Sequence, residues 1–143
     1  MYNTFINSFS MQQLTSEKIR EAEIRSSGRP YAFFIKCLDE LGVDKYEVSL
    51  KNGDRSFTYS INQELVIPGN TSYQRHCSDV FELSAVVAAV MRNKQGQTDY
   101  GKFLDEIAHA GVHTYTADVA GKQVIYNGKK VSQVYAEPIP SIE

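Results

Sequence analysis

Apolar residues recur at two different spacings along the chain, and the spacing changes at a glycine. Before Gly42 they fall three or four positions apart, which predicts a helix with one buried face; the stripe consists of Tyr31, Phe34, Ile35, Leu38 and Leu41. After Gly42 apolar and polar residues alternate, as in a strand with one buried face. Tyr46, Val48 and Leu50 share that face. The pattern therefore predicts a helix that ends at Gly42 and a strand that follows it.

The first part of the chain extends this pattern to two helices and three strands. Thr15 is the predicted N-cap of a helix over about 15–25, and Pro30 is expected at the first position of the next helix. Asn52-Gly53 is a strong hairpin signal between the first two strands. The return strand carries Phe57, Tyr59 and Ile61 on its inner face, and a third strand covers 65–67.

The second part of the chain predicts the same order of elements. An Asp79/Glu82 capping box begins a helix over about 79–93, which we expect to be the most buried one. The next helix is capped by Thr98 or Asp99 and ends at Gly111. Strands are expected over about 114–119, 123–126 and 131–136. The prolines of the segment 137–140 are expected to end the ordered chain.

The two parts are related by an offset of 69 positions. Between residues 14–46 and 83–115, six of 33 aligned residues are identical: Leu14/Leu83, Tyr31/Tyr100, Phe34/Phe103, Gly42/Gly111, Val43/Val112 and Tyr46/Tyr115. Apolar, turn and aromatic residues recur in the same order without a gap, which indicates a tandem duplication of one supersecondary unit. A single three-stranded unit cannot cover its own apolar face, so two units sharing a core are expected.

We therefore predict an α+β fold built from a duplicated helix-helix-strand-strand-strand unit. Six antiparallel strands, as one sheet or two adjoining sheets, pack with four helices about a pseudo-two-fold axis. The predicted single domain covers residues 11–140, with repeats at about 14–67 and 79–136 and a connector at 68–78. Residues 1–10 are expected to form a flexible extension.

Composition narrows the function classes. The chain has 143 residues, 42% of them hydrophobic, and a formal charge of −2, with no basic run of the kind that binds nucleic acid. No secretory signal and no membrane-spanning apolar stretch is recognised, so we expect a cytoplasmic protein that does not interact with membranes.

Cys37 and Cys77 have no metal-ligand spacing, and no cofactor or metal is predicted. Cys37 is expected in the core.

Several motifs resemble one family. Gly42-Val43-x-x-Tyr46, the segment Gln95-Gly96-x-Thr98-Asp99-Tyr100-x-x-Phe103, Gly111-Val112 and Glu137-Pro138-Ile139-Pro140 together resemble the YbcV-like family of small bacterial proteins. The resemblance covers about residues 14–140. Members are often labelled phage envelope protein, which implies an association with prophages. The family has no established activity, so the resemblance implies no catalytic or binding residue. Residues 1–10 and the pair His76-Cys77 lie outside the recognised pattern.

His76-Cys77 is the most reactive-looking pair, because an imidazole within hydrogen-bond reach can activate a thiol. Neighbouring side chains of an extended segment face opposite sides, which favours a structural role. His109 and His113 are separated by the helix-ending Gly111, so they do not form a metal pair. His109 near a helix end is explained by the helix dipole.

Asp99-Tyr100 begins a helix after a glycine-containing loop, where backbone N–H groups and a phenol can hold an anion. The structural interpretation is that Asp99 caps the helix and Tyr100 begins its buried stripe. Strand tyrosines, Tyr46 and Tyr115 among them, form either part of the core or an aromatic surface for a partner or a flat ligand. The candidate binding residues are His76, Cys77, Asp99, Tyr100, Tyr46 and Tyr115.

No convergent set of acid, base and nucleophile is recognised, so no catalytic residue is predicted. The leading hypothesis is a non-catalytic interaction or accessory protein, of host or prophage origin, that binds a protein or a small ligand. The alternative is a small enzyme or ligand-binding domain with a cleft between the repeats, containing His76, Cys77 or Asp99 together with tyrosine hydroxyls. The predicted sheet also has exposed edge strands with unpaired backbone groups, through which two copies of the chain can form a homodimer.

Overall fold

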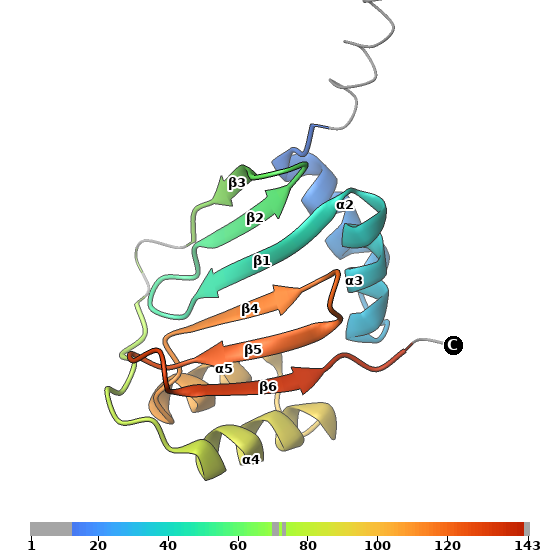
Figure 1. Cartoon of the computed structure of the whole chain (residues 1–143). Helices are drawn as coiled ribbons and strands as arrows, with labels where there is room; N and C mark the ends of the chain where they lie inside the picture. The colour runs from blue at the N-terminus through green and yellow to red at the C-terminus, as the bar shows by residue number, and fades with distance from the viewer. Residues whose placement is uncertain (1–12, 70–71, 73, 142–143) are drawn as a thin grey trace, which may run out of the picture.

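The computed structural model describes residues 13–69, 72 and 74–141, and in these residues six antiparallel strands form one sheet. The strand order is β3-β2-β1-β4-β5-β6. In Figure 1, α5 is partly hidden behind the sheet, α2 and α3 lie at its right and α4 lies below β6. The elements of the first repeat are α2 (Ser16–Ser26), α3 (Tyr31–Glu40), β1 (Val43–Ser49), β2 (Arg55–Tyr59) and β3 (Gln63–Ile67). Those of the second repeat are α4 (Leu83–Lys94), α5 (Tyr100–His109), β4 (Thr114–Asp118), β5 (Gln123–Asn127) and β6 (Val134–Pro138).

The sheet register makes the pseudo-two-fold relation explicit. β1 pairs with β4 in antiparallel register, and Glu47 lies opposite Thr116. These two residues are 69 positions apart, so each is the repeat equivalent of the other. The pseudo-two-fold axis therefore passes between them, at the centre of the sheet. The predicted duplicated α+β unit is confirmed, and the two repeats share one continuous sheet.

The helix ends follow the sequence signals closely. The Thr15 hydroxyl accepts a hydrogen bond from the Lys18 backbone N–H at 3.2 Å, and the Asp99 carboxylate accepts one from the Lys102 N–H at 2.8 Å. Both interactions satisfy backbone donors that a helix N-terminus leaves unpaired. Pro30 occupies the N-cap of α3, one position before its predicted place. After the helices, Gly42 and Gly111 adopt left-handed backbone angles, as expected of helix stops.

The predicted start of α4 is wrong. The helix begins at Leu83, and its N-cap residue Glu82 makes no side-chain capping bond. The segment before it runs past the end of α5, where the Ser78 and Glu82 N–H groups donate to the Ala108 and Ala110 carbonyls. These long-range bonds replace the local helical ones. The expectation that α4 is the most buried helix is also wrong, because α4 buries three of its 12 residues whereas α5 buries four of its 10.

Two strand boundaries differ from the periodic pattern. Ile61 lies in the β2–β3 turn with a positive φ and is 90% exposed, so it does not continue the inner face of β2. β6 begins at Val134, because Val131 lies in the preceding turn and is fully exposed. Pro138 is the last residue of β6. A proline is tolerated there because β6 is an edge strand and its missing N–H breaks no inner ladder.

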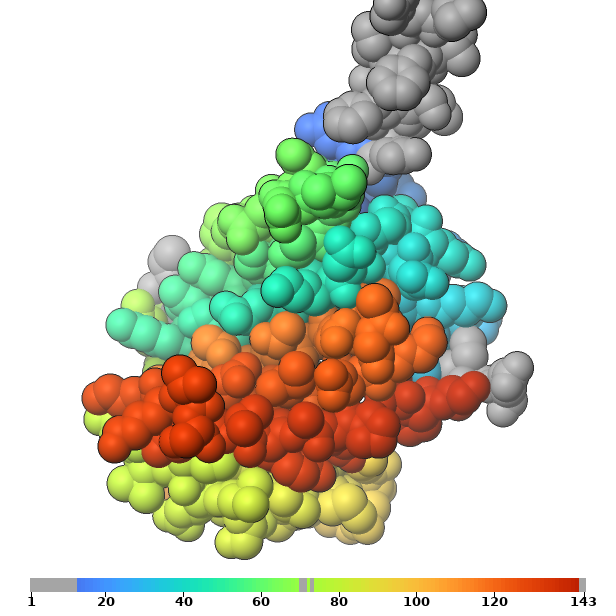
Figure 2. Space-filling model, viewed as in Figure 1, coloured from blue at the N-terminus to red at the C-terminus, as the bar shows by residue number. Residues whose placement is uncertain are grey.

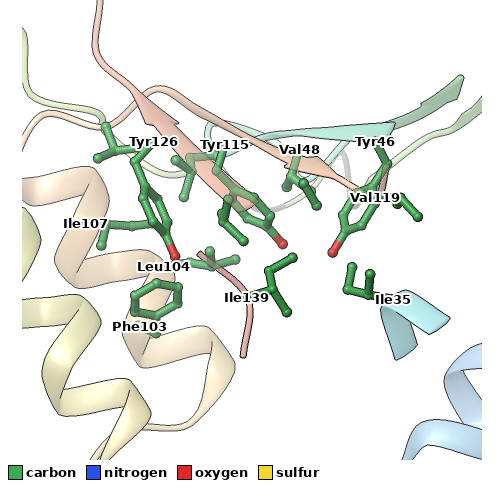
Figure 3. Close-up of a cluster of buried hydrophobic side chains, with 14 of the residues drawn as sticks. Ile35, Tyr46, Val48, Phe103, Leu104, Ile107, Tyr115, Val119, Tyr126 and Ile139 are labelled. Atoms are coloured by element: carbon green, nitrogen blue, oxygen red, sulfur yellow. The ribbon is translucent and has the colours of Figure 1, made fainter. Parts of the chain in front are cut away.

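The core lies between the sheet and the helices. The inner face of the sheet, which is turned toward the helices, carries Tyr46, Val48, Tyr115 and Tyr126 (Figure 3). These side chains pack against residues of α3 and α5, among them Ile35, Phe103, Leu104 and Ile107. The opposite face is the one turned to the viewer in Figure 2, and none of the described helices covers it. Short or charged side chains such as Thr116 and Glu47 face outward there, as on the solvated side of an antiparallel sheet.

Candidate functional site

Four tyrosines meet at the pseudo-two-fold axis, and we call them the tyrosine cluster: Tyr31, Tyr46, Tyr100 and Tyr115. The hydroxyls of Tyr31 and Tyr46 are hydrogen-bonded to each other, and those of Tyr100 and Tyr115 lie 2.6 Å apart. The second pair is the repeat equivalent of the first. Across the axis the rings of Tyr46 and Tyr115 meet edge to face, with centroids 6.2 Å apart, a favourable aromatic geometry.

The fold places these tyrosines by repeating one local arrangement. Tyr46 lies on β1 and Tyr115 on β4, the two central strands of the sheet. Their hydroxyls point away from the sheet toward the helices in Figure 3. Tyr31 and Tyr100 are the first residues of α3 and α5, so each reaches its strand partner from a helix N-terminus. The cluster thus joins the helical hairpins of both repeats to the middle of the sheet.

The four phenols differ in exposure. Tyr46 and Tyr115 are buried, whereas Tyr31 is 42% and Tyr100 55% exposed, with their hydroxyls turned inward. Burial raises the pKa of each of the four phenols above its ordinary value. The cluster is therefore uncharged at neutral pH. It can donate and accept hydrogen bonds, and it presents two half-exposed aromatic rings to a ligand.

Two hollows adjoin at the tyrosine cluster, and together they form what we call the seam groove. They share four lining residues, Pro30, Tyr31, Tyr100 and Tyr115. Each hollow has walls from both helical hairpins. The volumes are about 760 and 640 Å³, which is the range of small-molecule sites.

The larger hollow, here the arginine hollow, extends toward the first repeat. Arg55 from β2 and Arg75 from the connector line it, and Arg29 and Glu23 add further charge. Arg55 Nη1 donates to the Glu23 carboxylate at 2.7 Å, and Arg75 Nε donates to the Asp105 carboxylate at 2.7 Å. Arg75 is positioned by its own backbone N–H, which donates to the Lys51 carbonyl beside the β1–β2 turn.

The smaller hollow, here the aliphatic hollow, extends toward the second repeat. Val90, Val124 and Ile139 line it, together with the C-terminal segment 137–141. Lys94 and Glu137 also line it, and Lys94 Nζ donates to the Glu137 carboxylate. Because these two charges neutralise each other, the hollow presents a largely apolar surface.

The structure brings together three of the six predicted site residues. Tyr46, Tyr100 and Tyr115 belong to the tyrosine cluster. Asp99 precedes Tyr100, but its carboxylate caps α5 and lines neither hollow.

His76 and Cys77 lie in the connector and line neither hollow. The His76 side chain is exposed, whereas Cys77 is half-buried and packs against the core. Burial raises the pKa of the Cys77 thiol, so less of the nucleophilic thiolate forms at neutral pH. Cys37 is buried in the core, as predicted.

Sequence reasoning missed three residues that line the groove, Tyr31, Arg55 and Arg75. Tyr31 was assigned to the core stripe, although its equivalence to Tyr100 is visible at the 69-residue offset. Arg55 also leaves a signal, because it shares the inward parity of Phe57 and Tyr59 on β2. A charge on the apolar face of a strand is unusual and points to a special role. Arg75 could not be found in this way, because the connector shows no helical or strand pattern of apolar and polar residues.

The described residues contain no group of three or more His, Cys, Asp or Glu side chains placed to hold a metal ion. In the same part of the chain, no helix combines the length and the apolar character needed to cross a membrane. His113 is engaged elsewhere, with its Nε2 2.9 Å from the Ser78 carbonyl oxygen.

The comparison with protein families gives one match. The profile of the family described as Protein of unknown function (DUF1398) covers residues 18–138, nearly the whole described domain. The chain belongs to this family. The match includes all four residues of the tyrosine cluster as well as Arg55 and Arg75. A search of curated proteins found no match. The DUF1398 assignment thus gives a family for the fold and leaves the chemistry of the seam groove to be argued from its residues.

Proposed function

We propose that this DUF1398 protein is a non-catalytic binding protein whose ligand is a small organic molecule held in the seam groove. The observation that carries the proposal is the convergence of both repeats on the tyrosine cluster. Two half-exposed rings, Tyr31 and Tyr100, lie where the hollows meet. Half-exposed rings with fixed hydroxyls suit a flat ligand, which can stack on them and share their hydrogen bonds.

Binding without catalysis is favoured by the chemistry of the lining. Among the described residues, no histidine or cysteine lines either hollow. The phenols have raised pKa values because they are buried, so they are poor proton acceptors at neutral pH. Both hollows have walls from the two repeats, but His76, Cys77 and Asp99 line neither of them. A nucleophilic mechanism therefore gains no support.

The broader role that we propose is that of a cytoplasmic accessory protein of a bacterium or its prophage. Its support is the resemblance to the YbcV-like proteins, often labelled phage envelope protein, and the two unpaired cysteines. A homodimer through the edge strand β3 is compatible with a ligand in the groove, because no β3 residue lines either hollow, whereas the edge strand β6 contributes Glu137 and Pro138 to the aliphatic hollow.

The test is an NMR screen of small aromatic and aliphatic compounds against protein with labelled tyrosine rings. We expect compounds that bind to shift the ring signals of Tyr31 and Tyr100, and Tyr100→Ala to weaken binding several-fold, because it removes the stacking surface. Leu83→Ala is the matched control, since Leu83 is similarly exposed, at 51%, and lines neither hollow. Hits that leave both ring signals unchanged would contradict the proposal.

A further inference from the structure

The two ends of the seam groove differ in charge because one repeat-equivalent position differs. Arg55 on β2 and Val124 on β5 are 69 positions apart. Each lies on the inner face, two residues before a ring that pairs across the sheet with a cluster tyrosine: Phe57 with Tyr46, and Tyr126 with Tyr115. The pseudo-two-fold axis thus relates a guanidinium in the arginine hollow to an isopropyl group in the aliphatic hollow.

The arginine hollow has an excess of positive charge. The described charged residues that line it are three arginines and one glutamate, and Asp105 pairs with Arg75 from outside the lining, so three guanidinium groups face two carboxylates. The Arg55 and Arg75 side chains are 26% and 14% exposed, whereas their carboxylate partners Glu23 and Asp105 are 44% and 56% exposed. The two arginine side chains are thus less exposed than the carboxylate side chains that they contact. A guanidinium carries several N–H donors, so an anion can bind it in addition to its first carboxylate partner.

The aliphatic hollow offers the complementary surface. Val90, Val124 and Ile139 form its apolar part, and its described charged residues, Lys94 and Glu137, are paired with each other. An apolar group placed there gains burial and leaves that ion pair intact. The tyrosine cluster lies between the two ends, and its outer rings belong to both hollows.

We infer that the ligand is an amphipathic organic carboxylate with a fixed orientation in the groove. The carboxylate lies at Arg55 and Arg75, the flat part of the molecule stacks on Tyr31 and Tyr100, and the apolar end faces Val124 and Ile139. This inference rests on the proposed binding function and adds the chemical class and the direction of the ligand. Arg55 and Arg75 are then the residues that select a carboxylate over a neutral compound of the same shape.

The experiment compares two probes of nearly identical shape, 2-naphthoate and 2-naphthamide, titrated into the full chain and followed by the ring signals of Tyr31 and Tyr100. We expect the carboxylate to bind about tenfold more tightly than the amide. Arg55→Gln should remove most of this preference, because it weakens binding of the carboxylate more than binding of the amide. Arg25→Gln on α2 is the matched control, because Arg25 is exposed and lines neither hollow.

The outcomes separate this inference from the proposed function. Equal affinities for the two probes, or a preference that survives both Arg55→Gln and Arg75→Gln, would overturn the carboxylate assignment and leave groove binding standing. If neither probe shifts the two tyrosine rings, the groove fails as a binding site for flat molecules, and both proposals fall. The two arginine variants are tested separately, so that a folding defect in one, seen by urea denaturation, still leaves the other to decide.

Discussion

At the scale of single residues, equivalent positions of the two repeats have the same backbone and different surroundings. Gly42 and Gly111 both follow a helix and have φ values of +84° and +103°. A Cβ built at Gly42 meets nothing within 4 Å, whereas one at Gly111 lies 2.3 Å from the Val80 carbonyl oxygen. The first glycine is required for its backbone angle. The second is required also because the segment before α4 packs directly on it.

Alanine substitution should separate these two requirements. Gly42→Ala is expected to lower the free energy of unfolding by about 1 kcal/mol, the cost of a left-handed alanine. Gly111→Ala should cost about 3 kcal/mol or more, because the Val80–Phe81 backbone must also move. Urea denaturation of both variants measures the difference. Equal losses would show that the close contact at Gly111 carries no energy.

The buried phenols predict how stability depends on pH. The pKa values of Tyr46 and Tyr115 in the folded protein lie well above the ordinary value of 10, because burial disfavours the phenolate. The folded state therefore holds protons that the unfolded state loses above pH 10, so the contribution of these two phenols to stability is constant below that pH and falls above it. Each group contributes a slope of up to about 1.4 kcal/mol per pH unit.

The double variant Tyr46→Phe/Tyr115→Phe tests this pH dependence. It should be less stable at neutral pH, because Tyr31 and Tyr100 lose their hydroxyl partners, but its stability should fall less steeply above pH 10. Urea denaturation across the alkaline range supplies both quantities. Parallel curves for the variant and the wild type would mean that these phenols do not cause the alkaline loss.

At the scale of elements, side-chain caps mark the start of two of the four described helices. α2 and α5 start directly after residues whose side chains accept a backbone hydrogen bond, Thr15 and Asp99. α4 starts after Glu82, which makes no such bond. Its start is fixed by the backbone contacts of the preceding segment with the end of α5.

Alanine substitutions at the three cap positions should follow this distinction. Thr15→Ala and Asp99→Ala are expected to cost about 1 kcal/mol each, the usual value of a side-chain cap. Glu82→Ala should change stability by less than about 0.5 kcal/mol. The free energies of unfolding from urea titrations give the comparison. If Asp99→Ala also abolished ligand binding without changing stability, Asp99 would belong to the site rather than to the cap.

Local signals were sufficient to predict most of the elements. The helix α3, the glycine stops and the Asn52-Gly53 turn depend on neighbouring residues, and the structure confirms them, although Tyr31 of the predicted α3 stripe is 42% exposed. The start of α4 was predicted wrongly, because long-range backbone bonds determine it. The end of β2 was predicted wrongly, because Ser60, Ile61 and Asn62 adopt positive φ values in a local turn. Ile61, for example, continues the alternation of β2 and yet lies in a turn.

At the scale of the whole molecule, the central β1–β4 pair makes the two repeats one structure. The core clusters of both repeats also meet through Tyr46 and Tyr115. Neither repeat can lose its fold without exposing the inner face of the other. We therefore expect equilibrium unfolding to be a single cooperative transition.

Core truncation in either repeat should destabilise the entire chain. Leu38→Ala and Ile107→Ala remove fully buried side chains from α3 and α5, and each should cost roughly 2–5 kcal/mol. Amide signals from both repeats should lose intensity at the same urea concentration in each variant. Separate transitions for the two repeats would show that the shared sheet does not couple them.

The candidate site could be predicted only in part from the sequence, because it forms where the two repeats meet at the pseudo-two-fold axis. Tyr46 and Tyr115 could be named as strand tyrosines, but their meeting depends on the register in which Glu47 faces Thr116. Arg75 enters the groove through a connector whose path is set by long-range backbone bonds. The difference between Arg55 and Val124, in contrast, could be found by comparing the two repeats position by position.

The claim that the seam groove is the binding site is tested most directly by intermolecular nuclear Overhauser effects between 2-naphthoate and the labelled protein. If the seam groove is the binding site, we expect contacts from the naphthyl protons to the rings of Tyr31 and Tyr100. Contacts to residues on the opposite face of the sheet, such as Thr116, with none to these two rings, would contradict it.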